Sequence, residues 1–242
     1  MLRAAPSSDS NSNFKGVRDT NRLPVFPLAV YTIVALNVAV FLHETAIGGA
    51  GAREAFISTY ALIPFDVTSG VQLAPPAPPT LATLVTSQFL HGSVLHIFFN
   101  MLFLAVFGPA IEYLTGHVRF VLFYLACGVL GSLAQLWATP GSHVPAIGAS
   151  GAIAGVLGAY IVRFPLFPLF LRLPAILVIG LWAAVQFVHG FSSVSGRVLS
   201  EQGGGVAYFA HIGGFLGGVF LIALFGVRSA TLVQRRYRYY YR

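Results

Sequence analysis

The chain has 242 residues, of which 56% are hydrophobic and only 9% are charged. Soluble domains carry about 25% charged residues, so a water-soluble globular protein is excluded and an integral membrane protein is expected. The formal net charge of +7 comes from basic residues that cluster at the two ends and in short segments. This distribution fits membrane orientation and argues against a nucleic-acid groove.

Six apolar segments lie between two polar tails, and they predict an all-α, polytopic bundle of six transmembrane helices. Residues 1–22 predict a disordered cytoplasmic tail, residues 23–227 the membrane domain, and residues 228–242 a basic cytoplasmic tail. The expected spans are 23–42, 87–113, 120–137, 150–162, 173–188 and 206–227. The fourth span is shorter than the roughly 20 helical residues that a bilayer core requires.

The segment 45–80 between the first two spans is expected to be a structured loop in the membrane interface. It ends in a proline-rich stretch at 75–79 that forbids a regular helix, yet it is rich in aromatic and aliphatic residues. Its start, His43-Glu44, does not open a zinc-protease HExxH motif, because Ile47 stands where the second histidine would be. No metal site is therefore expected.

Six spans place both termini on the same side of the membrane. On that topology 12 of the 14 Lys and Arg residues share the side of the termini, and Arg53 and Arg197 are the exceptions. Cytoplasmic segments carry the excess of basic residues, so both termini are expected in the cytoplasm, with a bacterial plasma membrane as the expected location.

Three polar positions are expected at similar depth, a few residues below the outer membrane surface. Ser150 stands between Gly148 and Gly151 at the start of the fourth span, His96 and Asn100 share one face of the second, and His211 is near the start of the sixth. Each of these residues could also have a purely structural role, because a serine can hydrogen-bond to its own helix backbone and a histidine can hydrogen-bond to a neighbouring helix. Their common depth favours a site.

The chemistry of such a site is nucleophilic catalysis. A neutral histidine can accept the proton of a serine hydroxyl near pH 7, and glycines at 151, 155, 213, 214, 217 and 218 would let the two helices approach closely. Since no Asp or Glu lies at that depth, Ser150 and His211 would act as a dyad without metal or cofactor. His96 and Asn100, with the N–H of Ser150, would stabilise a developing oxyanion.

These residues fall in three motifs, which are His96-Ile97-Phe98-Phe99-Asn100, Gly148-Ala149-Ser150-Gly151 and Ala210-His211-Ile212-Gly213-Gly214. In this order and on these segments they resemble the motifs of the rhomboid intramembrane serine proteases, over about residues 23–227. The resemblance implies Ser150 as nucleophile, His211 as general base, and His96, Asn100 and Gly148 as the oxyanion-binding group. It also implies transmembrane protein substrates, cut near the outer face of the lipid bilayer.

The sequence departs from the best-known bacterial pattern of that family in two places. An aromatic residue that stacks on the histidine is replaced by Ala154, and Tyr208 and Phe209 are candidates for holding the His211 ring instead. The Trp-Arg pair of the loop is absent, since Ala52 precedes Arg53. The other histidines, His91 included, are expected to be interfacial residues.

Two other functions compete with this interpretation. A rhomboid-like protein that binds transmembrane clients without cutting them typically lacks the serine or the histidine, and this chain keeps both. A transporter or channel usually shows internal repeats or paired broken helices, which the sequence lacks. The fifth span and the Gly-rich segment 190–205 are further expected to move to admit substrate, which cross-linking of the fifth span to the second would block.

Overall fold

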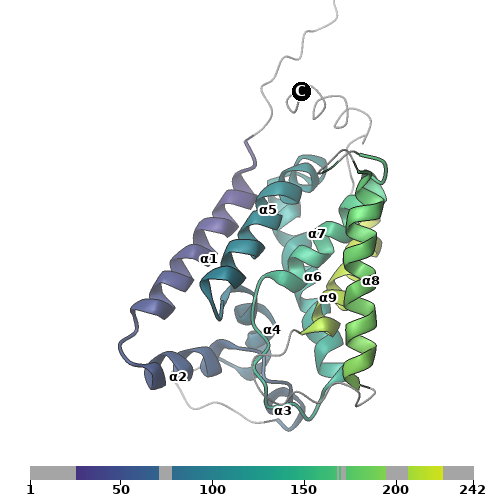
Figure 1. Cartoon of the computed structure of the whole chain (residues 1–242). Coiled ribbons are helices and arrows are strands. Elements are labelled where there is room, and N and C mark those ends of the chain that lie inside the picture. Colours follow the sequence, from purple (N-terminus) through teal and green to yellow (C-terminus); the bar gives the residue numbers. More distant parts are fainter. Residues whose placement is uncertain (1–25, 71–77, 168, 170–172, 195–206, 226–242) are drawn as a thin grey trace, which may run out of the picture.

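The computed structural model describes residues 26–70, 78–167, 169, 173–194 and 207–225. The two tails, Pro75 and Pro76, and most of the segment 190–205 therefore lie outside the described residues. The elements in chain order are α1 (Leu28–Ala46), α2 (Ala50–Tyr60), α3 (Pro64–Thr68), η1 (Thr80–Ala82), α4 (Thr83–Thr86), η2 (Ser87–Phe89), α5 (Val94–Thr115), α6 (His117–Ala138), α7 (Ser150–Arg163), α8 (Ala175–Val194) and α9 (Tyr208–Leu224). Figure 1 shows them as a helical bundle, with α2 to α4 gathered at the end opposite the start of α1.

The all-helical prediction is confirmed for the described part of the chain, where every element is a helix. By length and composition α1, α5 and α6 could each cross a membrane, and α7, the 175–189 part of α8, and α9 are shorter apolar helices. These six helices correspond to the six expected spans. That all six cross the membrane stays a prediction.

Two element boundaries differ from the sequence prediction. The second span begins at Val94 and not at residue 87, because Ser93 accepts a hydrogen bond from the His96 N–H at 3.2 Å and so caps α5. The preceding residues form η2 and a bend, which places His91 outside the helix. At the other end of the chain, α8 continues to Val194, into the segment expected to be a loop.

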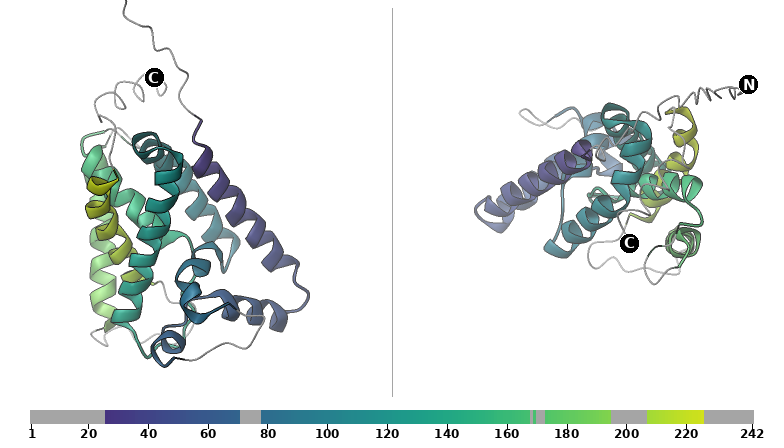
Figure 2. Two further views of the ribbon diagram at one scale, coloured as in Figure 1. Left: turned by 180° about the vertical axis from the view of Figure 1, so that it is seen from behind. Right: turned by 90° about the horizontal axis from the view of Figure 1, so that it is seen from above.

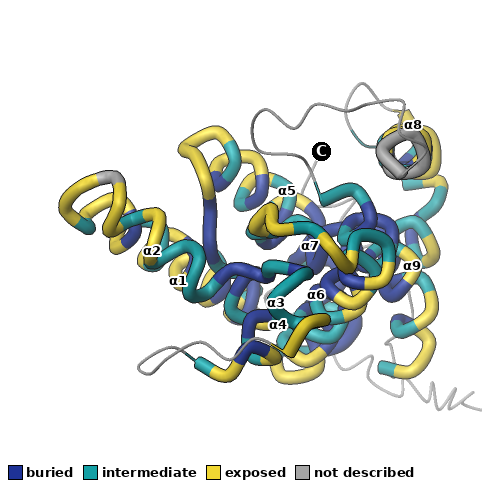
Figure 3. The backbone as a smooth tube through the Cα atoms, turned by 90° about the horizontal axis from the view of Figure 1, so that it is seen from below, coloured by how far each residue is buried: buried dark blue, intermediate teal, exposed yellow. Residues whose placement is uncertain are grey.

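Helix α7 lies at the centre of the bundle. Every residue from Gly151 to Tyr160 is buried, and Figure 3 shows α8 and the α1–α2 pair at opposite margins. Figure 2 gives the same arrangement from behind and from above. A membrane helix that is apolar on all sides can face either lipid or protein, so it is the burial of α7 that shows the element beginning with Ser150 to be held from several directions.

Glycines bring α7 and α9 into backbone contact, as the sequence predicted. A Cβ added at Gly214 would overlap the Gly151 carbonyl oxygen, and one at Gly218 would overlap the Gly155 carbonyl oxygen. The other glycine pair of α9 faces α6, since a Cβ at Gly213 would lie 2.8 Å from the Leu130 carbonyl oxygen. Alternate glycine faces of α9 therefore serve two neighbouring helices.

At the end of the bundle where α1 begins, a buried carboxylate caps this helix. Glu112 accepts hydrogen bonds from the N–H groups of Ala29 at 2.9 Å and Val30 at 2.8 Å, and it also contacts His117 Nδ1. The first N–H groups of a helix lack partners within it and carry partial positive charge. Glu112 thus connects α5 to the start of α1. A separate hydrogen bond, from Arg119 Nη1 to the Phe225 carbonyl at 3.4 Å, connects α6 to the end of α9.

Candidate active site

Ser150 and His211 meet at the contact between α7 and α9. Ser150 is the first residue of α7, and His211 lies in the first turn of α9. The distance between Ser150 Oγ and His211 Nε2 is 2.7 Å, a hydrogen bond between residues 61 positions apart. The glycine contacts of α7 and α9 set this distance, since a larger spacing between the helix backbones would separate the two side chains.

The second ring nitrogen of His211 is also engaged. His211 Nδ1 lies 2.8 Å from Gln186 Oε1, which comes from α8. An amide oxygen can only accept, so this contact is a hydrogen bond when Nδ1 carries the proton, a tautomer that leaves the lone pair of Nε2 free. The Ser150 hydroxyl is then the donor to Nε2, which is the polarity that a serine nucleophile and its base require.

An aromatic ring other than the two expected ones lies beside His211. The ring centroid of Trp182 is 5.9 Å from that of His211, with 38° between the ring planes. Tyr208, which the sequence offered for this place, stacks instead on His189, with centroids 5.3 Å apart. Trp182 therefore takes the place next to the imidazole that Ala154, buried in α7, leaves open.

The sequence interpretation missed both Gln186 and Trp182. It treated the fifth span as a plain apolar helix, although Gln186 is a polar residue within it and Trp182 lies four residues earlier on the same face. A polar group in a membrane helix normally faces the bundle interior. The rule that singled out His96 and Asn100 would have singled out Gln186.

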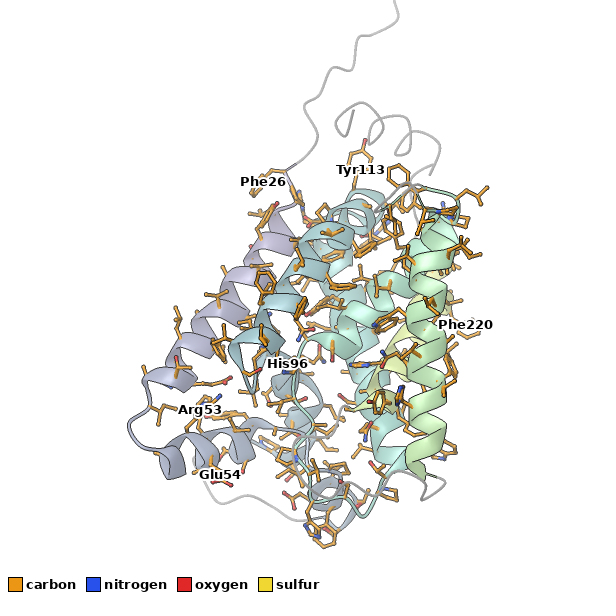
Figure 4. The ribbon with its side chains drawn as sticks, in the orientation of Figure 1. Phe26, Arg53, Glu54, His96, Tyr113 and Phe220 are labelled. Carbon is orange, nitrogen blue, oxygen red and sulfur yellow. The ribbon has the colours of Figure 1, made fainter. Side chains whose placement is uncertain are left out.

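His96 and Asn100 lie on the face of α5 that lines a cavity of about 660 Å³ next to Ser150. Figure 4 shows His96 at the start of α5, pointing into the bundle. The cavity is lined by residues of α5, α7, α8 and α9 and by the segment before α7, among them Phe99, Phe103, Ile147, Ile153, Leu157, Trp182 and His211. It is an apolar space with a few convergent polar groups, the usual character of a binding site.

The side chain of Asn100 has an unpaired donor in this cavity. Asn100 is 7% exposed, and its Nδ2 amide has no hydrogen-bond acceptor among the residues that the structure describes. A buried donor without a partner costs about 1–3 kcal/mol. A donor at the wall of this cavity can bind an oxygen atom that enters it.

Gly148 contributes space to the site and not a hydrogen bond, which corrects the sequence expectation. Its N–H already donates to the Ser87 carbonyl at 2.8 Å. Its φ of +119° is a backbone conformation that favours glycine, and a Cβ there would lie only 2.8 Å from His96 Nε2. The same Cβ position is 3.6 Å from Asn100 Nδ2, so the His96 and Asn100 side chains converge on the backbone two residues before Ser150.

The start of α7 adds two further features to the site. The N–H of Ser150, as the first residue of a helix, has no acceptor within that helix. The positive end of the helix dipole also lies there and favours negative charge. Both features suit an anion that forms beside the Ser150 hydroxyl.

Helix α7 is too short to cross a bilayer core by itself. It has 14 residues, about 21 Å at 1.5 Å per residue, whereas a bilayer core is about 30 Å thick. That Ser150 lies below the outer surface, with the irregular backbone of the segment 139–149 lining the cavity before it, stays a prediction. Hydrogen bonds between Leu62 and Ala146, at 3.2 Å and 2.8 Å, tie that segment to the α2–α3 region.

Buried polar residues hold the segment that leads into α5. Glu44 accepts the N–H of His91 at 3.2 Å, and Arg53 Nη2 donates to the carbonyls of His91 at 3.4 Å and Gly92 at 3.3 Å. Figure 4 shows Arg53 on α2, near this segment. Arg53 thus anchors α2 without a preceding tryptophan.

His91 is part of this anchored segment and is not an interfacial residue, which corrects the sequence expectation. It is fully buried, with its ring edge against that of His96 at a centroid distance of 5.0 Å. Burial, together with the nearby His96, lowers the pKa of His91 to about 4. His91 is therefore neutral at pH 7 and supports the His96 ring by contact.

No group of three or more His, Cys, Asp or Glu side chains that could hold a metal ion is found within the described ranges. The donors around Ser150 are hydroxyl, imidazole and amide groups. This set matches acyl transfer, in which a hydroxyl attacks a carbonyl carbon and N–H donors stabilise the resulting oxyanion.

Comparison with known proteins places the chain among rhomboid proteins. Residues 78–228 match the family model described as the Rhomboid domain. The chain is 31% identical over 211 residues to Rhomboid protease GluP of Bacillus subtilis (strain 168), an alignment that covers 87% of this chain and 37% of that protein. It is 30% identical over 215 residues to the mitochondrial Rhomboid protein 1 of Saccharomyces cerevisiae, covering 86% and 55% of the two chains.

A relative described as inactive is also similar. Inactive rhomboid protein 1 of Drosophila melanogaster is 32% identical over 84 residues, which cover 35% of this chain and 6% of that protein. The chain spans between 37% and 55% of the length of the Bacillus and yeast relatives. The relatives thus include proteins named as proteases and a protein named as inactive.

Proposed function

This chain belongs to the rhomboid family, and we propose that it is an intramembrane serine endopeptidase. Ser150 is the nucleophile and His211 the general base, and the reaction uses no metal or cofactor. The substrates are transmembrane segments of other membrane proteins, cut near the outer face of the membrane.

The reaction follows from the polarity of the hydrogen bond between Ser150 and His211. As Ser150 Oγ attacks the scissile carbonyl carbon, its proton passes to His211 Nε2, 2.7 Å away. The tetrahedral oxyanion receives hydrogen bonds from Asn100 Nδ2, His96 and the N–H of Ser150. His211 then protonates the leaving amine, and a water molecule, activated by the same imidazole, hydrolyses the acyl-enzyme.

The substrate class follows from where the cavity lies. Its wall is mainly apolar, and Ser150 begins a helix too short to span the bilayer core. A segment that reaches the hydroxyl must enter among membrane helices, which a soluble protein does not do. An unwound part of a transmembrane segment would present its carbonyl to Ser150 here.

The observation that carries this proposal is the hydrogen bond of 2.7 Å between Ser150 Oγ and His211 Nε2. A structural serine usually bonds to its own helix backbone, whereas this hydroxyl bonds to a histidine of another helix at the edge of a cavity. Asn100 lines the same cavity, so its amide can donate to an oxyanion that forms when Ser150 attacks. His96 meets the same small area of the cavity from the same face of α5.

The test is cleavage of a panel of transmembrane reporter proteins by the full chain in proteoliposomes. Ser150→Ala and His211→Ala are expected to abolish cleavage. Ser132→Ala is the matched control, because Ser132 is a buried serine that donates to the Leu84 carbonyl at 3.2 Å, away from the cavity. Undiminished cleavage by the Ser150→Ala protein would contradict the proposal.

A second candidate function is binding of transmembrane clients without cleavage, which the similarity to a relative described as inactive favours. The same experiment separates the two functions. Capture of reporters that stay intact, equally by the wild-type protein and by Ser150→Ala, would support the binding function and contradict the protease.

A further inference from the structure

We propose that Gln186 is the positioning residue of the dyad, and that α8 controls through it the proton position and the orientation of the His211 ring. This inference rests on the proposed serine-protease function and assigns a residue to it. Ser150, His211 and Gln186 then form a chain of two hydrogen bonds, in which a neutral amide takes the place of the carboxylate of a catalytic triad.

The geometry places Gln186 in line with the other two groups. Its Oε1 is 2.8 Å from His211 Nδ1, and His211 Nε2 is 2.7 Å from Ser150 Oγ. If the imidazole proton moved to Nε2, that nitrogen could no longer accept the serine proton, and Nδ1 would face an oxygen that can only accept. With Oε1 toward Nδ1, as here, the Gln186 amide disfavours the tautomer that is unable to act as a base, whereas the opposite amide orientation would present an N–H donor and favour it.

The choice of an amide has a physical reason. His211 is 9% exposed, and the contact lies in the apolar bundle between α8 and α9. A carboxylate there would carry a charge into a poorly solvated environment, which costs far more than a paired neutral amide. Gln186 supplies the same acceptor oxygen without that charge.

Gln186 also makes the ring position depend on α8. Trp182 lies four residues earlier on the same helix and packs beside the His211 ring. Helix α8 lies at the margin of the bundle (Figures 2 and 3) and packs mainly on α9 and α7. A displacement of α8 would remove the acceptor and the flanking ring together, so the dyad is aligned only while α8 is docked.

The first measurement is made on the wild-type protein. With histidine selectively labelled with nitrogen-15, and the His211 signals assigned through His211→Ala, the nitrogen chemical shifts are expected to show the proton on Nδ1. A proton on Nε2 in the folded, neutral wild-type protein would overturn the proposal without any variant.

The variants then separate positioning from packing. Gln186→Met keeps the length of the side chain and removes the acceptor, and we expect kcat to fall about 10- to 100-fold with KM nearly unchanged, less than the about 10⁴-fold loss that a wrong tautomer causes. Its His211 signals should show a mixture of tautomers. Gln186→Glu keeps an acceptor oxygen but brings a carboxylate into this apolar contact, and its unfolding temperature in detergent is expected to fall below that of the wild-type protein.

The matched control is Gln135→Met. Gln135 Oε1 accepts the N–H of Ala210 at 3.3 Å, one residue before His211, without touching the imidazole. The His211 tautomer should be unchanged in this variant. Wild-type kcat and tautomer in Gln186→Met, or the same tautomer change in Gln135→Met, would overturn the proposal, whereas labelling of Ser150 by a fluorophosphonate would still support the protease.

Discussion

At the scale of single residues, Asn100 is the site residue whose replacement is expected to affect stability and catalytic rate in opposite directions. Its Nδ2 amide makes no hydrogen bond to any residue in the described part of the chain, so its removal breaks no such bond in the folded protein. In the proposed transition state the same amide donates to the oxyanion.

Replacing Asn100 by leucine should therefore have opposite effects on stability and rate. Asn100→Leu removes the unpaired amide, so we expect an unfolding temperature in detergent equal to or above that of the wild-type protein. Removal of one oxyanion donor should lower kcat about 10²- to 10³-fold. Asn37→Leu is the control, because Asn37 is fully buried in α1, away from the cavity, and should leave kcat unchanged. An Asn100→Leu protein that is less stable but fully active would contradict this role.

The low pKa of the His91 ring leads to a prediction of how the unfolding free energy depends on pH. Its neighbours are the Glu44 carboxylate, the Arg53 guanidinium and the His96 ring, and burial holds its pKa at about 4, below the ordinary 6.5. The unfolded chain then binds more protons between these two values, so the stability from the neutral ring is complete above pH 6.5 and is lost as the pH falls toward 4. Each pH unit in this window costs about 1.4 kcal/mol.

The measurement compares the wild-type protein with His91→Phe, which keeps an aromatic ring against His96 and removes the titrating group. The difference in unfolding free energy between pH 7 and pH 4.5 should be smaller in His91→Phe. An identical pH dependence in both proteins would show that His91 is not the group that titrates.

At the scale of elements, the glycine contacts between α7 and α9 set the distance within the dyad. We expect Gly214→Ala to lower stability by about 1–3 kcal/mol, because its Cβ would overlap the Gly151 carbonyl oxygen. Cleavage should fall about 10²-fold or more, since a shift of about 1 Å at a reacting group has that effect.

Gly180→Ala is the matched control for that substitution. Gly180 is also a helical glycine, in α8, but a Cβ there would meet nothing within 4 Å. The higher helix propensity of alanine should leave stability unchanged or raised by up to about 1 kcal/mol. Equal losses in the two variants, measured by thermal unfolding in detergent, would show that backbone contact between α7 and α9 is not the cause.

The sequence predicted the helices and the pairing of Ser150 with His211 because both depend on local patterns. Apolar runs mark helices in a membrane, and the glycine pairs mark the faces that touch. The start of α5 was placed seven residues too early, although His91, Gly92 and Ser93 interrupt the apolar run there, because Ser93 was not recognised as the cap of the helix. Gln186 and Trp182 were missed because the fifth span was interpreted as a plain apolar helix, although a polar residue within it indicates an inward-facing side. His91 was missed because Glu44 and Arg53 hold its segment from distant parts of the chain.

At the scale of the whole molecule, the two ends of the bundle differ in charge. Among the described residues Arg119 and Arg163 lie near the end where α1 begins, and Arg53 lies near the other end, where Figure 1 shows α2 and α3. An excess of basic residues marks the cytoplasmic side. This orientation would place the cavity on the outer half of the membrane and both tails inside.

Single cysteines on the two sides of α7 test this orientation. Val144, in the segment before α7, is 53% exposed and Leu166, after its end, is 77% exposed, while the native Cys127 is buried. In intact cells a membrane-impermeant maleimide should label Val144→Cys and should label Leu166→Cys only after permeabilisation. The reverse pattern would invert the topology and move the cavity to the cytoplasmic half.

The most direct test of the central claim is reaction of the purified protein with a fluorophosphonate, which labels only an activated serine. The peptide that contains Ser150 should be labelled in the wild-type protein and in the Ser132→Ala control, and in neither Ser150→Ala nor His211→Ala. A folded wild-type protein that does not react, or labelling that persists in Ser150→Ala, would contradict a serine protease built on Ser150 and His211.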